Sequence, residues 1–160
     1  MTVNTKKVSG RRTVRYESYA DMLADAEAMV ASDIKLVGNW SLGQILKHLA
    51  FSHHFAVDGA NMSIPWPMKF VMKLAMKNRF LNKGLPSGYT IPKKMESVLI
   101  AAEDTVAPQA LEDLRAAVER VQSSPTLAKH GMFDELTHEE WEKFNLRHAE
   151  MHMSFVVPQS

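Results

Sequence analysis

Three of the seven histidines in this 160-residue chain stand where their imidazoles could share one metal ion. His148 and His152 are four residues apart, and side chains at that spacing lie on one face of a helix. His48 stands in a separate amphipathic segment that could bring a third nitrogen to the same ion. Three protein nitrogens and one open position are typical of a metal that binds or activates a further ligand. The sequence therefore predicts a metal site at these residues, although each could also be a core histidine bonded to a carbonyl.

The composition restricts the chemistry of such a site. The chain has no cysteine, so a metal would be held by nitrogen and oxygen, and a thiol nucleophile would have to arrive as a cosubstrate. Imidazole suits zinc or nickel, and iron, manganese and cobalt stay open. The ion would lower the pKa of a bound water or hold a bound thiol as thiolate. We therefore expect a divalent cation and a small-molecule substrate.

Two polar residues are candidates to line the pocket, because the second ring nitrogen of a ligating histidine needs a hydrogen-bond partner. Ser52 stands one turn after the first of the three histidines, and Asn145 stands shortly before the second. Either could equally be a polar residue tolerated at the edge of the core. No general base stands out, since Glu140 fits a helix cap and Glu150 is expected to face solvent. The catalytic residues stay unassigned.

The other four histidines fit the ligand pattern less well. His53 and His54 follow the first candidate ligand by five and six residues and turn off its helix face, so surface or site-mouth positions are expected. His130 precedes a glycine in a loop, and His138 directly follows a helix cap, where solvent is its natural neighbour. The segment around His138 also lacks the second histidine that a zinc-protease motif requires.

Both segments that carry the candidate ligands begin with strong helix-start signals. Ser41 and Gln44 have the spacing of a capping box, in which each side chain bonds the other residue's backbone N–H. Thr137 and Glu140 repeat this pattern. These signals set where each helix begins, so they also set how far along its axis the histidines lie. All three histidines fall well inside their helices rather than at frayed ends.

Hydrophobic periodicity predicts an all-α fold. Apolar residues recur every three to four positions over four segments of bundle length, and no strand pattern is convincing. The expected elements are a flexible lead-in over 1–15, bundle helices over 18–31, 41–60, 108–123 and 137 to a point before Pro158, and a basic helix over 67–81. A turn-rich loop over 85–92 and a segment over 95–104, helical or irregular, complete the crossover. We expect one domain over 1–160, built as a four-helix bundle with one long crossover.

The order of these motifs resembles the DinB-like family of metal-dependent helical bundles, which includes bacterial thiol transferases. The resemblance covers about Tyr16 to Phe155 and suggests an uncharacterised branch of the family. It rests on Asn39-Trp40-Ser41-Leu-Gly-Gln-Ile-Leu-Lys-His48-Leu-Ala50 and on Leu136-Thr137-His-Glu-Glu-Trp141 leading to His148-x-x-x-His152.

The resemblance implies an up-down-down-up bundle, with the metal ligands carried over to His48, His148 and His152. It also implies a metal-dependent enzyme of the thiol-dependent transferase or hydrolase type, using a low-molecular-weight thiol, and it suggests a homodimer. No residue here identifies a thiol pocket, and a fold does not fix an activity.

Charge and hydropathy exclude several classes of function. The formal net charge is +1, which indicates no nucleic acid partner. No apolar run approaches the roughly 18–20 residues of a membrane span, and the N-terminal residues lack the apolar core of a signal peptide. The absence of cysteine fits a reducing compartment, so we expect a cytoplasmic location.

The alternative function is a non-catalytic helical bundle that works by self-association or by binding a membrane or partner surface. Its best candidate is the segment 66–83, where Lys69, Lys73 and Lys77 recur among methionines and other apolar residues. We expect instead that this helix packs over the bundle with its lysines in water, so membrane contact is not expected.

Overall fold

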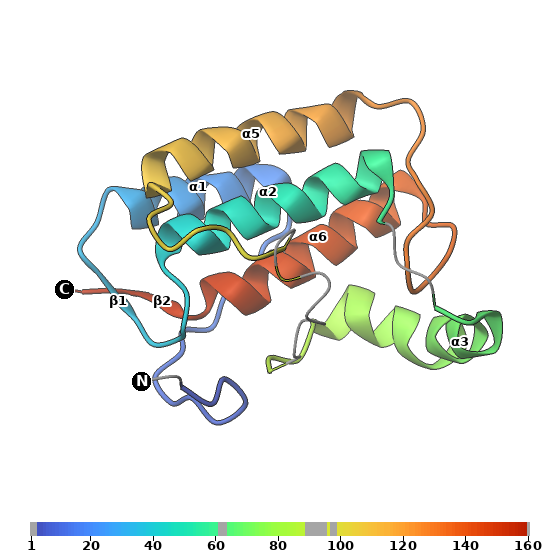
Figure 1. Cartoon of the computed structure of the whole chain (residues 1–160), viewed down its shortest axis with the longest axis horizontal. Helices are drawn as coiled ribbons and strands as arrows, with labels where there is room; N and C mark the ends of the chain where they lie inside the picture. The colour runs from blue at the N-terminus through green and yellow to red at the C-terminus, as the bar shows by residue number, and fades with distance from the viewer. Residues whose placement is uncertain (1–2, 61–63, 89–95, 97–98, 160) are drawn as a thin grey trace.

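Four helices lie side by side and form the body of the molecule (Figure 1). They are α1 (Tyr19–Val30), α2 (Leu42–Asp58), α5 (Ala107–Ser123) and α6 (His138–Met153). Following the colours along the chain, α2 and α5 run in one direction, and α1 and α6 run in the other (Figure 1). The all-α bundle and its up-down-down-up order agree with the expectation from the sequence.

This computed structural model describes residues 3–60, 64–88, 96 and 99–159. Residues 85–88 of the turn-rich loop expected over 85–92 are described, but residues 89–92, like residues 95, 97 and 98 of the segment expected over 95–104, lie outside those ranges. The long connection between α2 and α5 is present, and it carries α3 (Trp66–Lys83).

Capping boxes set the starts of the two helices that carry the candidate ligands. The Ser41 side chain accepts the backbone N–H of Gln44, and the Gln44 side chain accepts the N–H of Ser41. Thr137 and Glu140 form the same reciprocal pair at the start of α6. Both predicted starts are confirmed, and satisfying these otherwise unpaired N–H groups stabilises each helix end by about 1 kcal/mol.

The apolar faces of the four bundle helices pack together into the main core. Helices of 12 to 17 residues are marginal alone in water, so burial of these faces supplies most of their stability. The fully buried members of the core include Met22, Leu46, Leu49, Leu114 and Met153. A second cluster joins α3 and the loop before α6 to the bundle through Phe80, Phe133, Trp141 and Phe144.

A two-stranded sheet at the ends of α1 and α6 corrects the expectation of a fold without strands. β1 (Ile34–Leu36) pairs antiparallel with β2 (Val156–Pro158), with Leu36 opposite Val156. Helix α6 therefore ends at Met153, earlier than its apolar pattern indicated. Three-residue strands are too short to show the alternation by which strands are recognised in a sequence.

The N-terminal segment also differs from the expected flexible lead-in. The backbone N–H of Arg12 donates to the Ser154 carbonyl, and its guanidinium pairs with Asp25 at 2.6 Å. Arg11 donates to the hydroxyls of Ser154 and Ser87. These contacts fasten residues 11–12 to the end of α6.

One face of helix α3 packs on the bundle, and Met72 and Met76 contribute to it as partly buried residues of the second cluster. Phe80 and Leu81 are buried there, whereas Trp66 is 79% exposed and Leu74 is 77% exposed. The expected packing of this helix over the bundle is therefore present, but Lys77 pairs with Glu140 at 2.6 Å and is only 20% exposed instead of lying in water. Gly84 closes the helix with a φ of 99°. No helix among the described residues is long and apolar enough to cross a bilayer.

Candidate metal centre

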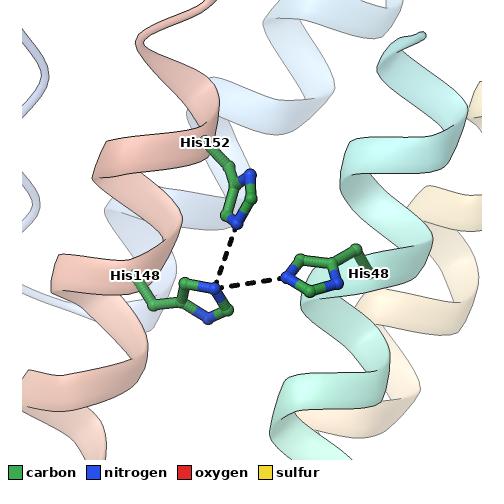
Figure 2. A group of neighbouring side chains, drawn as sticks. All are labelled: His48, His148 and His152. Atoms are coloured by element: carbon green, nitrogen blue, oxygen red, sulfur yellow. Dashed lines mark hydrogen bonds between the residues drawn. The ribbon is translucent and has the colours of Figure 1, made fainter. Parts of the chain in front are cut away.

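The structure brings His48, His148 and His152 together between α2 and α6. Figure 2 shows the ring of His48 projecting from one helix toward the rings of His148 and His152, which project from the other. Nε2 of His148 lies 3.2 Å from Nε2 of His48 and 3.1 Å from Nε2 of His152. One nitrogen of each ring lies within 4.8 Å of the other two. The predicted convergence of nitrogen donors from two helices is therefore present.

The spacing of the three nitrogens suits a small divalent cation. Nitrogens about 2.0–2.1 Å from a tetrahedral zinc ion lie about 3.3–3.4 Å apart. The two Nε2 separations that involve His148, 3.2 and 3.1 Å, come close to that value, and the three nitrogens all lie within 4.8 Å of one another, so side-chain movements that bring His48 and His152 closer together would surround an ion. Three protein ligands leave the fourth position of a tetrahedral ion open for water or substrate.

Hydrogen bonds behind the rings orient the nitrogens toward that common point. Nδ1 of His48 lies 2.8 Å from the Leu99 carbonyl, which only accepts, so Nδ1 carries the proton and Nε2 holds a lone pair. Ser52 Oγ lies 3.1 Å from Nδ1 of His148 and can accept its proton in the same way. Such partners fix the tautomer and the orientation of a ligating imidazole.

Burial keeps the three imidazoles in the neutral form that binds metals. It lowers the pKa of His48, and the hydrogen bond to the Leu99 carbonyl only partly opposes that shift. Burial lowers the pKa values of His148 and His152 well below their usual value, and the neighbouring imidazoles lower them further. A metal would therefore compete with few protons at neutral pH.

A cavity of about 700 Å³ opens beside the three rings, within the usual size range of small-molecule sites. All three histidines and Ser52 line it. Its wall is largely apolar, and includes Trp40, Phe55, Trp141, Phe144, Met151 and Phe155. The indole of Trp40 stacks on His152, with ring centroids 5.2 Å apart and planes 5° apart. A metal held here would face an apolar space large enough for a substrate.

The two expected pocket-lining residues have different positions. Ser52 is buried beside His148, as described above, whereas Asn145 is absent from the cavity wall. Asn145 is fully buried and donates to the Tyr19 hydroxyl on α1. Asn145 stands one turn before His148 but is rotated by about 60° around the helix axis, and this offset is enough for its side chain to reach Tyr19 on α1 instead of the cavity.

Two other expectations about polar residues were wrong. Glu150 does not face solvent, because it is buried, pairs with Arg147 at 2.7 Å and accepts the backbone N–H of Tyr16. His53 is fully buried rather than at the surface or the site mouth, and its Nδ1 lies 2.7 Å from the Leu49 carbonyl. In each case the partner lies on the neighbouring element or within the same helix, which charge patterning alone does not reveal.

Sequence reasoning missed three groups that shape the site: the Trp40 ring, the Leu99 carbonyl and the His130 side chain, which also lines the cavity. In the sequence, Trp40 stands out only as part of the motif that resembles DinB-like proteins, which does not indicate a place beside the metal ligands. The Leu99 carbonyl is a backbone group and leaves no mark in the residue types. His130 lies in a loop without helical periodicity, so only its residue type could have drawn attention to it.

Comparison with known proteins gives one match. Residues 8–159 match a family model described as "Protein of unknown function (DUF1569)". Comparisons with curated proteins and with solved structures found no match. The DinB-like relationship expected from the motifs is not among these findings.

Proposed function

We propose that this chain, which belongs to the DUF1569 family of proteins of unknown function, binds a divalent metal ion through His48, His148 and His152. The observation that carries the proposal is that the Nε2 atoms of three neutral imidazoles lie close enough together to bind one metal ion. Neutral imidazole nitrogens that face one another in a buried site are best satisfied by a shared cation. Zinc or nickel suits three imidazoles, and iron, manganese and cobalt remain alternatives.

We further propose that the bound ion makes the protein an enzyme of the thiol-dependent transferase or hydrolase type. The ion, when bound, would supply an acidified water or a thiolate. The cavity beside the histidines supports a small-molecule substrate, and the lack of cysteine means that any thiol comes from a cosubstrate. The resemblance to DinB-like bundles supports the reaction type, and the shared up-down-down-up order is consistent with it.

Metal analysis of protein purified without a histidine tag tests the binding step. We expect close to one equivalent of zinc or nickel in the parent protein and a large loss in both His48→Ala and His148→Ala. His138→Ala is a matched control, because this exposed histidine begins α6 and bonds the Ser124 carbonyl. Background metal in the parent, or equal metal in all variants, would remove the shared site.

Turnover tests the second step. The metal-loaded protein is assayed with panels of electrophiles, each with and without a small thiol, and with ester and amide substrates. We expect turnover that disappears in His48→Ala and persists in His138→Ala. Full metal occupancy without turnover across both panels would leave a metal-binding protein and refute the proposed enzyme.

The exposed face of α3 supports a second candidate function, peripheral binding to an anionic lipid surface. Trp66, Phe70 and Leu74 recur every four residues and are exposed, so they form a stripe along one side of the helix. The helix contains five basic residues and no acidic one. Apolar side chains beside basic ones are the composition with which helices lie on anionic membranes. Symmetric pairing of two such helices would instead place like charges together.

Co-sedimentation with vesicles tests this second candidate. We expect binding to phosphatidylcholine vesicles that contain about 30% phosphatidylglycerol, with the weak, reversible affinity that a few apolar anchors and basic groups provide. We expect no binding to vesicles of phosphatidylcholine alone. Leu74→Glu should abolish it. If neither vesicle binds the protein at low salt, the proposal fails, and a concentration-dependent dimer that Leu74→Glu dissociates would assign the face to a second copy.

A further inference from the structure

The loop between α5 and α6 holds a histidine in a single tautomer. Nδ1 of His130 accepts the backbone N–H groups of Met132 and Phe133, each at 3.2 Å. Both partners are donors, so Nδ1 carries a lone pair, and in the neutral ring the proton lies on Nε2. The backbone of the loop therefore makes this side chain a hydrogen-bond donor through Nε2.

The ring of His130 is also held firmly in place. It stacks on Phe133, with centroids 4.9 Å apart and planes 10° apart, and meets the edge of Phe144 at 4.4 Å. Backbone hydrogen bonds between His130 and Asp134, of 2.6 and 2.9 Å, close the loop behind it. Phe144 in turn lies 6.1 Å from the ring of His148. A polar group fixed by packing and backbone bonds is suited to orienting a ligand.

His130 lines the same cavity as the three candidate metal ligands, although it is not one of them. Among the described residues, no acceptor bonds its Nε2. Burial lowers the pKa of His130 to about 4, so the ring is neutral at physiological pH and donates without carrying a charge. A donor at the cavity wall without an acceptor among the described residues favours a ligand that supplies one.

The charges around the cavity restrict what that ligand can be. The lining residues that the structure describes include no lysine or arginine, and their one carboxylate is Glu96, which is exposed. An anionic group would therefore find no basic side chain among these described lining residues, although Arg11 lies over the Phe155 ring and its charge lowers the pKa of His152. Most of the wall is aromatic, aliphatic or methionine, which suits an uncharged apolar body.

We propose that the Nε2–H of His130 donates a hydrogen bond to an acceptor oxygen, such as a carbonyl, of an uncharged and largely apolar substrate. The inference deepens the proposed function, since it assigns the substrate class of the same cavity and a binding residue opposite the histidine cluster. The hydrogen bond would fix the orientation of the substrate relative to the three imidazoles.

Intrinsic fluorescence can report on the cavity directly, because Trp40 and Trp141 both line it. The remaining tryptophan, Trp66, is exposed on α3 and is replaced in a Trp66→Phe parent. The probes are benzamide, which offers a neutral carbonyl, ethylbenzene, which offers no acceptor, and benzoate, which is charged. All titrations contain EDTA, so their outcome does not depend on metal binding.

The test variant is His130→Asn in the Trp66→Phe parent. The asparagine Oδ1 can still accept the two loop N–H groups, but the shorter side chain has no donor at the position of Nε2. We expect benzamide to bind about 3- to 10-fold more weakly to this variant, the effect of one lost hydrogen bond, with ethylbenzene changed less than 2-fold. Benzoate should bind the parent more weakly than benzamide.

Four results would overturn the inference: equal benzamide affinity in both proteins, a parallel loss for both neutral probes, benzoate binding as well as benzamide, or no quenching by any probe. If the His130→Asn protein does not fold, the titrations are replaced by nitrogen-15 NMR of the histidines in the parent protein. There we expect the Nε2–H tautomer of His130 and a shift of that signal with benzamide but not with ethylbenzene, and the opposite tautomer would refute the proposal. Metal content is measured separately, so a protein that binds no metal would refute the proposed function without affecting this inference.

Discussion

Replacing Ser52 by alanine tests whether the metal site depends on a hydrogen bond made behind the ligands. Ser52 is 8% exposed, and its Oγ lies 3.1 Å from Nδ1 of His148. With Nε2 bound to the metal, the proton of His148 is on Nδ1 and donates to the Ser52 hydroxyl. In the alanine variant this hydrogen bond is lost, so the ring is free to place its proton on Nε2, the nitrogen that faces the other two rings. Loss of such a partner weakens metal binding by about 10- to 100-fold, equivalent to about 1.4–2.7 kcal/mol.

The affinity is measured by competition with a chromophoric zinc chelator at pH 7. Ser32→Ala is the control, because this exposed serine bonds the Ala28 carbonyl at the far end of α1 and touches no candidate ligand. The free energy of unfolding in EDTA should change by no more than about 1 kcal/mol in Ser52→Ala, the net worth of one hydrogen bond. A zinc Kd within 2-fold of the parent would show that Ser52 does not orient His148 and would refute the reasoning.

Three further predictions concern stability. Gly43→Ala should lower the free energy of unfolding, measured by urea denaturation, by about 1–3 kcal/mol, although alanine has the better helix propensity. The cause is that the new Cβ would lie 1.9 Å from a backbone carbonyl oxygen, so a stabilised variant would contradict this close packing. Glu150→Ala should cost about 3–5 kcal/mol by leaving Arg147 buried without its partner, and a cost under 1 kcal/mol would show the pair to be dispensable. Burial lowers the pKa values of His53 and His130 to about 4, so the unfolded chain takes up protons below about pH 6.5 that the native state does not. The free energy of unfolding of the metal-free protein, measured by urea denaturation, should therefore fall from pH 7 to pH 5 by about 2 kcal/mol for each of these two histidines. A rise over that range would refute the argument.

The sequence was sufficient for the parts of the site that depend on local signals. The capping boxes at Ser41 and Thr137 set the starts of α2 and α6, and helical spacing then placed His48 and the pair His148 and His152 on apolar faces. Because apolar faces turn toward a common core, the three rings had a physical reason to meet. Their predicted convergence is confirmed at 3.1 to 3.2 Å between neighbouring nitrogens.

The parts that the sequence did not reveal depend on contacts between distant segments. Asn145 and Glu150 were judged by their neighbours along α6, but their partners lie on or just before α1. The pairing of β1 with β2 joins segments more than a hundred residues apart, and neither is long enough to show a strand pattern. The exposed apolar stripe on α3 was predicted only as the less favoured alternative, because an apolar residue in a helix is normally a packed one.

X-ray absorption at the metal edge of the zinc-loaded protein tests most directly whether three imidazoles share one ion. We expect one equivalent of zinc with three imidazole nitrogens at about 2.0–2.1 Å and one oxygen ligand from water, and the loss of one imidazole from that shell in His48→Ala. A coordination shell that His48→Ala leaves unchanged, or zinc at background level in the parent protein, would show that His48, His148 and His152 do not form a metal site.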